Sequence, residues 1–302
     1  MSIATGKFLG YLKYLKQKVT RTPRYLLTKK VREYLSSSEL KLNEYDRKGI
    51  LYFLRFNLID TFNYPYLHKY RFRRVRVFSD QDRGLSFVIT PQGHRLYFKR
   101  DMTKQEIVMS YNSLCSELDN ASPHNYNFDN LRVTEDSILA DIGSADGLFS
   151  LGYVNKIKKL YLFETEPEWI EALEATFHPW KEKVVIVNKY VSDRNEGEHI
   201  ALDHFFRNNE KATILKIDVD GAEKALISGG MQLVREGFAD ILLCTYHRTD
   251  DLEYFSKLLR EEHYDIKVSN GYMLYIWEQR SDYQIEPPYD FRRGLIHARR
   301  KN

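Results

Sequence analysis

The sequence contains few of the residues that mark a disulfide-rich, fibrous or membrane-spanning protein. Its 302 residues include only 2 Cys, 8 Pro and 15 Gly. Cys115 and Cys244 lie in different segments without metal-ligand spacing, so the sequence supports neither a disulfide framework nor a zinc site. No apolar run approaches the ~18 residues that span a bilayer, and lysines interrupt the N-terminal stretch where a signal peptide needs an apolar core. These absences predict a cytoplasmic protein.

Charge is distributed unevenly along the chain. Residues 1–76 contain 18 Lys and Arg against 5 Asp and Glu, a net charge of +13. The whole chain holds 46 basic and 42 acidic residues, which leaves 28 against 37 for residues 77–302, a net charge of −9. The chain therefore has a basic front and an acidic body, and it turns basic again near its C-terminus.

Changes of hydrophobic period divide the chain into four parts. The length suits a catalytic domain with an extension of about 100 residues. In chain order we expect a basic helical extension (1–75), a small antiparallel β meander with a helix and a connecting loop (76–130), a catalytic domain (131–278) and a basic C-terminal tail (279–302). Within the extension, apolar residues recur at helical spacing over 5–19, 24–35 and 47–61.

The catalytic part alternates strands and helices. Short apolar runs rich in β-forming residues predict strands over 137–141, 159–163, 183–187, 213–217, 240–244, 265–268 and 272–277. Helical patterns lie between them over 148–156, 167–177, 202–207, 222–236 and 251–262. Repeated strand–helix units predict an α/β fold with a parallel sheet and helices on both faces, in which ligands bind at the carboxyl ends of the strands.

A glycine-containing loop follows the first of these strands. Residues 141–147 read D-I-G-S-A-D-G, and the two glycines let the backbone turn tightly and approach a ligand. A dinucleotide fingerprint would read G-x-G-x-x-G, whereas D-x-G-x-x-x-G is typical of S-adenosylmethionine (SAM) sites. An ordinary strand–helix connection is the alternative. If SAM binds here, we expect contacts from Asp141, Gly143, Ser144 and Gly147.

The next two strands end in groups that suit the rest of a nucleoside. Glu164 ends the second strand about 20 residues beyond the loop, where a carboxylate can accept hydrogen bonds from ribose hydroxyls. Glu166 competes for this role, although Glu166-Pro167 is also typical of a helix start. Ser192 and Asp193 close the third strand and are predicted to meet the adenine edge, with a solvated turn as the alternative.

The fourth and fifth strands end in the candidate catalytic groups. Alternation places Asp218 and Asp220 on one side of a strand tip, where paired carboxylates raise at least one pKa if both are buried. The alternative for Asp220 is a cap of the helix that starts at Gly221. His247 is a candidate general base, because its unperturbed pKa lies near neutral pH, although a lone loop histidine is usually a surface residue. Asp218 is predicted both to contact the cofactor and to act in catalysis.

The same acids raise the question of a metal. Asp218, Asp220 and His247 offer oxygen and nitrogen ligands of the kind that Mg²⁺ or Mn²⁺ takes. A helix cap and a cofactor contact explain the two acids equally well. The sequence therefore predicts no metal site.

Several motifs, correctly ordered and spaced, carry a resemblance to a known family. They are Ser122-Pro123-His124-Asn125-Tyr126, the loop 141–147, Phe163-Glu164, Val191-Ser192-Asp193, Leu202-Asp203-His204-Phe205, Lys216-Ile217-Asp218-Val219-Asp220-Gly221-Ala222-Glu223 and Tyr246-His247. Through them, residues 84–277 resemble the FkbM-type SAM-dependent methyltransferases. Asp220 stands where that family usually has Glu. The resemblance implies a Rossmann-like seven-stranded sheet with a reversed last strand, and transfer of the SAM methyl group to a hydroxyl oxygen.

These features together predict a SAM-dependent O-methyltransferase. Members of the resembling family often act on sugars, lipids or polyketide products, so the expected acceptor is a saccharide, glycolipid or related small molecule. The sequence has no RNA-binding signature that would favour a nucleic-acid partner. The alternative is a non-catalytic SAM-binding or scaffold protein of a polysaccharide-assembly complex, which the intact loop 141–147 disfavours.

The basic N-terminus has two possible uses. Phe8, Leu12 and Leu15 lie on one side of the helix predicted over 5–19, with lysines around them. This face either packs on the acidic catalytic domain or touches an anionic membrane surface, where each basic residue contributes ~1 kcal/mol. The second use predicts weak, salt-sensitive peripheral binding to the inner membrane surface that needs residues 1–24.

Overall fold

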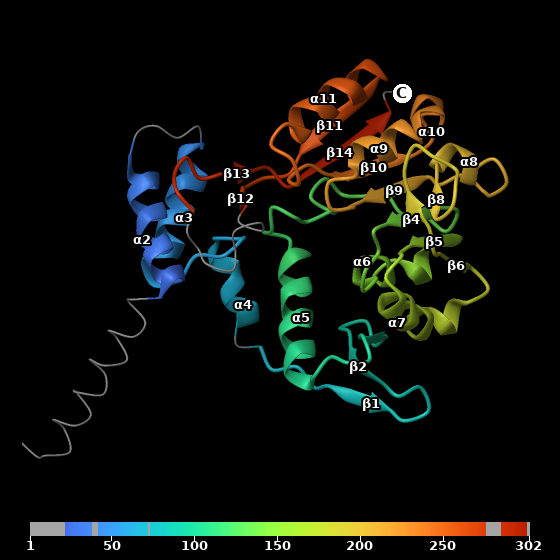
Figure 1. Ribbon diagram of the computed structural model, residues 1–302, viewed down its shortest axis with the longest axis horizontal. Coiled ribbons are helices and arrows are strands. Elements are labelled where there is room, and N and C mark those ends of the chain that lie inside the picture. Colours follow the sequence, from blue (N-terminus) through green and yellow to red (C-terminus); the bar gives the residue numbers. More distant parts are fainter. Residues whose placement is uncertain (1–21, 38–41, 72, 276–284, 301–302) are drawn as a thin grey trace, which may run out of the picture. The chain divides into compact units, whose positions relative to one another are not determined.

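The computed structural model describes residues 22–37, 42–71, 73–275 and 285–300, which fall into two compact units (Figure 1). The smaller unit combines the described residues up to Leu67 with those of Gly271–Arg292. The larger unit combines His68–Asn270 with the residues after Arg292. Each unit has its own apolar core. The helix predicted over 5–19 lies outside the described residues.

The larger unit is built around one seven-stranded sheet. Its strands are β4 (Ile138–Ile142), β5 (Lys159–Phe163), β6 (Val184–Val187), β9 (Ile214–Ile217), β10 (Asp240–Cys244), β11 (Tyr264–Val268) and β14 (Leu295–Arg300). They lie in the order β11-β14-β10-β9-β4-β5-β6. Strands β10, β9, β4, β5 and β6 run parallel, and β14 pairs antiparallel with both β10 and β11. This sheet confirms the predicted α/β fold with one reversed strand.

Helices cover both faces of the sheet. They are α5 (Lys104–Glu117), α6 (Leu148–Leu151), α7 (Pro167–Phe177), α8 (Leu202–Phe205), α9 (Glu223–Ser228), α10 (Met231–Glu236) and α11 (Asp251–Glu261), with the short η2 (Val154–Lys156) and η3 (His178–Trp180). The short helix α4 (His68–Arg71) contacts α5. Ala140 and Ile142 of β4 join a core cluster with residues of α8 to α11, whereas Leu139 joins a second cluster with α5, α6 and α7. Because both faces are buried, the strands read as continuous apolar runs.

The reversed strand differs from the sequence prediction. A last strand over 272–277 was predicted, and this was wrong. Of the described residues there, only Met273–Leu274 form a strand, β12, which pairs with β13 (Phe291–Arg292) in the smaller unit. The sheet is completed by β14 instead, from a segment expected to form a basic tail.

The charged residues of β14 explain why the sequence did not predict this strand. Leu295 is buried in one core cluster and Ile296 in the other. The guanidinium of Arg299 is neutralised by the carboxylates of Asp240 and Asp129, at 3.2 and 2.9 Å. These acids lie 59 and 170 residues away along the chain. The local sequence pattern therefore shows the arginines of this segment but not the distant acids that neutralise them, and the segment resembles an exposed basic tail.

The larger unit also contains two small sheets. Strands β1 (Phe78–Asp80), β2 (Leu85–Ile89) and β3 (Arg95–Tyr97) form the predicted antiparallel meander. Strands β7 (Tyr190–Val191) and β8 (His199–Ile200) pair in parallel. Near them, the single helix predicted over 222–236 is divided into α9 and α10. A Cβ on Gly229 between them would lie 2.0 Å from the carbonyl oxygen of Ser192, so this approach requires glycine.

The smaller unit is centred on α2 (Pro23–Ser36) and α3 (Glu44–Phe56), followed by η1 (Pro65–Leu67). The side chains of Thr22 and Asn43 accept hydrogen bonds from first-turn N–H groups and cap the two helices. Residues of both helices share a core with Leu274 and Tyr289 from the returning segment. The helices predicted over 24–35 and 47–61 are confirmed, with the second ending at Phe56. None of the described helices in either unit is long and apolar enough to cross a membrane.

We predict that deleting residues 293–302 unfolds the larger unit. The deletion removes the buried side chains of Leu295 and Ile296, each worth roughly 1.5–3 kcal/mol, and leaves the edges of β10 and β11 unpaired. That loss is large against the roughly 5–15 kcal/mol that stabilises a typical protein. Thermal unfolding followed by circular dichroism should lose its cooperative transition. A chain ending at Arg300 is the control, and equal melting of both chains would show that β14 is dispensable.

Candidate functional site

The loop between β4 and α6 depends on its two glycines. Gly143 and Gly147 have φ values of +75° and +76°, in the left-handed region that favours glycine. A Cβ at Gly143 would lie 1.8 Å from the carbonyl oxygen of Asp218, and one at Gly147 would lie 2.7 Å from the Leu173 side chain. The protein's own packing therefore requires both glycines, whatever ligand the loop binds.

The same loop is hydrogen-bonded to the end of β5. The N–H groups of Gly143 and Ser144 both donate to the Phe163 carbonyl at 3.1 Å. The N–H of Ala145 donates to Oε2 of Glu164 at 2.9 Å. Three of the predicted cofactor contacts, Gly143, Ser144 and Glu164, are thus brought together at the carboxyl edge of the sheet.

Glu164 is held by three backbone N–H groups. Besides Ala145, the N–H groups of Thr165 and Glu166 donate to its Oε1 at 2.7 and 2.8 Å. A carboxylate has about four acceptor positions, so about one is left for a ligand hydroxyl. The competing Glu166 forms an ion pair with Lys99. Of the two acids, Glu164 is the one that contacts the loop.

Asp141 forms a buried ion pair with Lys216, its partner in register on β9. Nζ of Lys216 lies 2.9 Å from Oδ1 of Asp141 and donates to the Gly143 carbonyl at 2.6 Å. Ser150 donates to Oδ2 of Asp141 at 2.6 Å. Burial lowers the pKa of Lys216, but the carboxylates of Asp141 and Asp218 outweigh it and hold that pKa above its usual value. The side chain of Asp141, predicted to contact a cofactor, is engaged in anchoring the loop and α6.

Ser192 and Asp193 lie in a separate turn after β7. Oγ of the buried Ser192 accepts a hydrogen bond from the N–H of Arg194 at 3.2 Å and lies 3.1 Å from Nδ1 of His199. Asp193 is exposed. Within the described ranges, neither residue is hydrogen-bonded to the loop 141–147. Their contact with an adenine edge stays a prediction.

Asp218 follows β9 and accepts hydrogen bonds from two phenols. The hydroxyl of Tyr126 donates to Oδ2 at 2.8 Å, and the hydroxyl of Tyr246 donates to Oδ1 at 3.2 Å. Burial raises the pKa of Asp218, but the adjacent His124 ring and the charge of Lys216 outweigh burial and hold that pKa well below its usual value. Asp218 is therefore a carboxylate at neutral pH.

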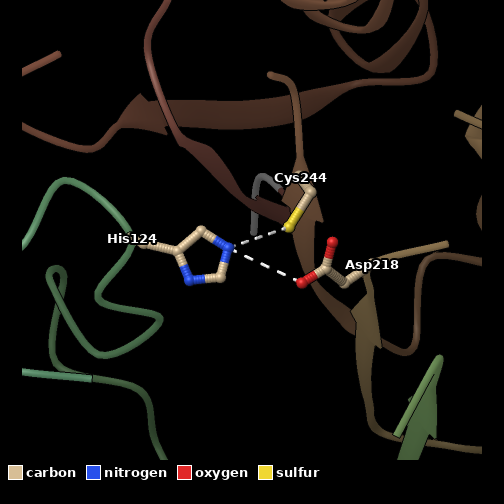
Figure 2. A group of neighbouring side chains, drawn as sticks. All are labelled: His124, Asp218 and Cys244. Atoms are coloured by element: carbon tan, nitrogen blue, oxygen red, sulfur yellow. Dashed lines mark hydrogen bonds and ion pairs between the residues drawn. The ribbon is translucent and has the colours of Figure 1, made fainter. Parts of the chain in front are cut away.

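Three aromatic residues around Asp218 have no role assigned from the sequence. Nε2 of His124 lies 3.6 Å from Oδ2 of Asp218. Figure 2 marks this contact with a dashed line. The His124 ring lies edge-on to the rings of Tyr126 and Tyr246, with centroids 5.0 and 5.3 Å away. Burial and the charge of Asp218 raise the pKa of both phenols well above the usual value. The motif over residues 122–126 was the sequence feature that could have pointed to this cluster. Its tyrosine, Tyr126, lies 92 residues from Asp218 along the chain, so the sequence alone does not show that the two are in contact.

The ring of His247 is held among acidic side chains. Nδ1 lies 2.7 Å from Oε1 of Glu223, while Nε2 lies 3.5 Å from Asp220 and 3.7 Å from Asp218. Burial lowers the pKa of His247, but the hydrogen bonds to Asp220 and Glu223 and the nearby negative charges outweigh it and raise that pKa to about 10. His247 is therefore an imidazolium at neutral pH, with both ring nitrogens as donors. The two predicted catalytic residues lie together, and Asp218 is the one in a form that accepts a proton.

The alternative role of Asp220 as a helix cap is wrong. Helix α9 begins at Glu223 behind Ala222, and no side chain caps it. Asp220 adopts a φ of +48° with its side chain fully exposed. Glu223 is buried and accepts a hydrogen bond from the N–H of Gly221 at 3.3 Å as well as contacting His247. Glu223 thus fixes the turn after β9 and orients the histidine ring.

Comparisons with known proteins give fold-level similarity at low identity. No protein-family model matches the chain, and no curated protein matches it either. Among solved structures, methyltransferase FkbM from Methylobacillus flagellatus KT shares 14% identity at a TM-score of 0.45, over 62% of this chain and 54% of that chain. Precorrin-6y C5,15-methyltransferase from Geobacter metallireducens GS-15 shares 14% at 0.40, over 60% and 90%. A putative methyltransferase from Streptococcus mutans, in complex with SAH, shares 13% at 0.39, over 57% and 94%.

These similarities leave activity to be argued from the site. This chain spans about half the length of the FkbM structure. All three TM-scores lie below 0.5. Membership of the FkbM-type family stays a prediction from the sequence motifs.

We predict that Gly143→Ala disrupts the loop because the new Cβ would meet the backbone carbonyl of Asp218 at 1.8 Å. Gly93→Ala is a matched control, since Gly93 has a φ of +84° but nothing within 4 Å of a new Cβ. Backbone strain alone should cost the control about 1 kcal/mol. Gly143→Ala should lower the free energy of unfolding in urea by at least about 2 kcal/mol more. Equal costs would contradict a rigid close approach between the loop and β9.

We predict that Asp146→Asn stabilises the protein increasingly as the pH rises from about 4 to about 7. Burial raises the pKa of the loop residue Asp146 to about 7, offset only in part by the N–H of Leu148. The unfolded chain ionises near a pKa of about 3.9 while the folded protein keeps its proton until about 7, so the wild type loses stability between these values. The free energies of unfolding of the two proteins, measured in urea across this pH range, should come to differ by up to a few kcal/mol, with the variant more stable. Asp136→Asn, at an exposed position, is the control, and a difference independent of pH would rule out the raised pKa.

Proposed function

We propose that this chain is a SAM-dependent O-methyltransferase that acts on a hydroxyl of a saccharide, glycolipid or related small molecule. One observation supports the proposal most. The loop 143–147, Glu164 and Asp218 converge at the carboxyl ends of the adjacent parallel strands β9, β4 and β5. Ligands of α/β sheets bind at this edge, and the loop lacks the spacing of a dinucleotide site.

The groups at this edge suit SAM. Glu164 keeps about one acceptor position for a ribose hydroxyl. The ion pair of Asp141 and Lys216 holds the Gly143 carbonyl, so the loop is preorganised before a ligand arrives. Ser192 is the proposed partner of the adenine, together with the adjacent Asp193. Bound SAM supplies an electrophilic methyl group on a positively charged sulfur.

Asp218 is the proposed proton acceptor. Transfer of that methyl group to a hydroxyl oxygen would make the hydroxyl proton strongly acidic, so a group of this chain would have to accept it. The ionised carboxylate of Asp218 can take that proton if it lies within ~3 Å of the hydroxyl. Because its low pKa makes it a weak base, the proton transfer belongs to the late stage of the reaction, when the hydroxyl is most acidic. The phenols of Tyr126 and Tyr246 fix the carboxylate in place.

His247 takes a positioning role in this proposal. Its ring already carries a proton at neutral pH, so the general-base role expected from the sequence passes to Asp218. The imidazolium lies 3.7 Å from Asp218 and stabilises the carboxylate before the proton arrives. Glu223 holds the ring in that orientation.

The acceptor class rests on the sequence motifs that resemble FkbM-type enzymes. Lipid-linked saccharides lie at membranes, so peripheral contact of residues 1–24 with an anionic leaflet belongs to the same proposal. A non-catalytic SAM-binding scaffold is the competing function. Such a scaffold would also use the loop 141–147 to bind SAM, but it would not need Asp218 as a proton acceptor.

We predict that Asp218→Asn lowers turnover by ~10²–10⁴-fold while SAM affinity stays within about tenfold of the wild type. Asparagine keeps the side-chain shape and removes the charge that accepts the proton. Calorimetric titration measures SAM binding. Mass spectrometry of glycans and lipids from a deletion strain, complemented with each variant, measures the methyl-sized mass increment.

Asp136→Asn is the control and should restore methylation in the deletion strain. An unchanged glycan and lipid profile in that strain, with SAM bound by the wild type, would favour the scaffold function. Absence of SAM binding by the wild type would contradict the proposal outright.

A further inference from the structure

A second chemistry is suggested by three side chains that converge from separate segments. His124 comes from the loop after α5, Asp218 follows β9, and Cys244 ends β10. Nε2 of His124 lies 3.6 Å from Sγ of Cys244 and 3.6 Å from Oδ2 of Asp218. All three ligand-type atoms lie within 4.8 Å of one another. Figure 2 shows the thiol and the carboxylate facing the same ring nitrogen.

The two 3.6 Å separations from Nε2 of His124 lie close to the edge length of a tetrahedral zinc site. Zinc binds nitrogen, oxygen and sulfur at about 2.0–2.3 Å, which puts tetrahedral ligand atoms about 3.3–3.6 Å apart. The gap between His124 and Asp218 is longer than the ~3.2 Å limit of a good N–H···O hydrogen bond. The Cys244 thiol and the His124 ring are within sulfur hydrogen-bond distance, and the same spacing suits three ligands of one ion. We propose that His124, Asp218 and Cys244 bind a zinc ion.

The donor set and the charges agree with zinc. Thiolate, imidazole and carboxylate are the ligands that zinc takes in proteins, and the soft thiolate disfavours Mg²⁺ or Ca²⁺. His124 and Cys244 are buried, and burial raises the pKa of the Cys244 thiol well above its usual value. Zinc binding would therefore release the thiol proton to solvent, and the resulting thiolate and the Asp218 carboxylate would neutralise the charge of the ion. Three protein ligands leave a fourth position open. The hydroxyl of Tyr126 lies 2.8 Å from Oδ2 of Asp218 and 3.2 Å from Sγ of Cys244.

A second group of possible ligands, Asp218, Glu223 and His247, is less suitable. Nδ1 of His247 and Oε1 of Glu223 already form a hydrogen-bonded ion pair at 2.7 Å. The same Glu223 oxygen accepts hydrogen bonds from the N–H groups of Val219 and Gly221. An ion there would have to break these contacts. The zinc site would take Oδ2 of Asp218, which faces His124, whereas Oδ1 faces His247 and would remain for the proposed proton transfer. The zinc site therefore does not require the proposed function.

The test measures metal content in the full chain. Plasma mass spectrometry of protein purified without chelator should find about one zinc per chain. After the zinc is removed with a chelator, added Co²⁺ should produce a thiolate-to-cobalt charge-transfer band in the near ultraviolet. Cys244→Ser should lose both the zinc and this band. Cys115→Ser is the matched control, because Cys115 is half-buried on α5 outside the cluster, and it should keep both.

The outcomes separate the zinc site from the proposed function. Wild-type protein that binds neither zinc nor cobalt, or a cobalt band that survives in Cys244→Ser, would overturn the site. If circular dichroism shows that Cys244→Ser does not fold, the wild type is tested instead: its zinc is removed with a chelator and zinc is then added back. Failure of the wild type to regain about one zinc per chain would also overturn the site. Calorimetric titration of SAM into zinc-free wild type tests the cofactor separately. SAM binding without zinc binding would overturn only the metal site, and zinc binding without SAM binding would overturn only the methyltransferase.

Discussion

The buried ion pair between Asp141 and Lys216 is the contact on which both the sheet and the site depend. It joins β4 and β9 at the centre of the sheet, with side chains only 1% and 7% exposed. Removing one partner of such a pair leaves a buried charge and costs about 3–5 kcal/mol. The same ammonium group also holds the Gly143 carbonyl, and the same carboxylate holds Ser150 of α6. One pair thus stabilises the core and shapes the loop.

The pairing register of β4 and β9 also determines which residues meet at the carboxyl edge of the sheet. Asp141 faces Lys216 in the parallel pairing, and two residues further along each strand stand Gly143 and Asp218. Their backbones approach so closely that a Cβ on Gly143 has no room. A slip by one residue would turn Lys216 to the other face of the sheet and separate it from Asp141. The fold and the candidate site are therefore specified by the same pairing.

Much of this arrangement could be predicted from local patterns. The parallel strands are continuous apolar runs, and each is followed by glycine or polar residues, which located the loop 141–147 and Asp218. Strand β14 could not be predicted, because Arg299 is neutralised by acids far away in the chain. The bond from Tyr126 to Asp218 joins a loop to a strand end across 92 residues, and such a contact has no periodic signature.

Protonation states were also beyond the sequence, because they depend on neighbours in space. An unperturbed pKa makes His247 a candidate base, yet its contacts with Asp220 and Glu223 raise its pKa and keep the ring protonated. The expected repulsion between Asp218 and Asp220 needs both to be buried, and Asp220 is fully exposed. Asp218 instead gains stabilisation from His124 and Lys216, which outweigh burial and lower its pKa, so its carboxylate stays ionised across the neutral range. Since neither Asp218 nor His247 changes charge there, this pair of residues does not act as a pH switch in the neutral range.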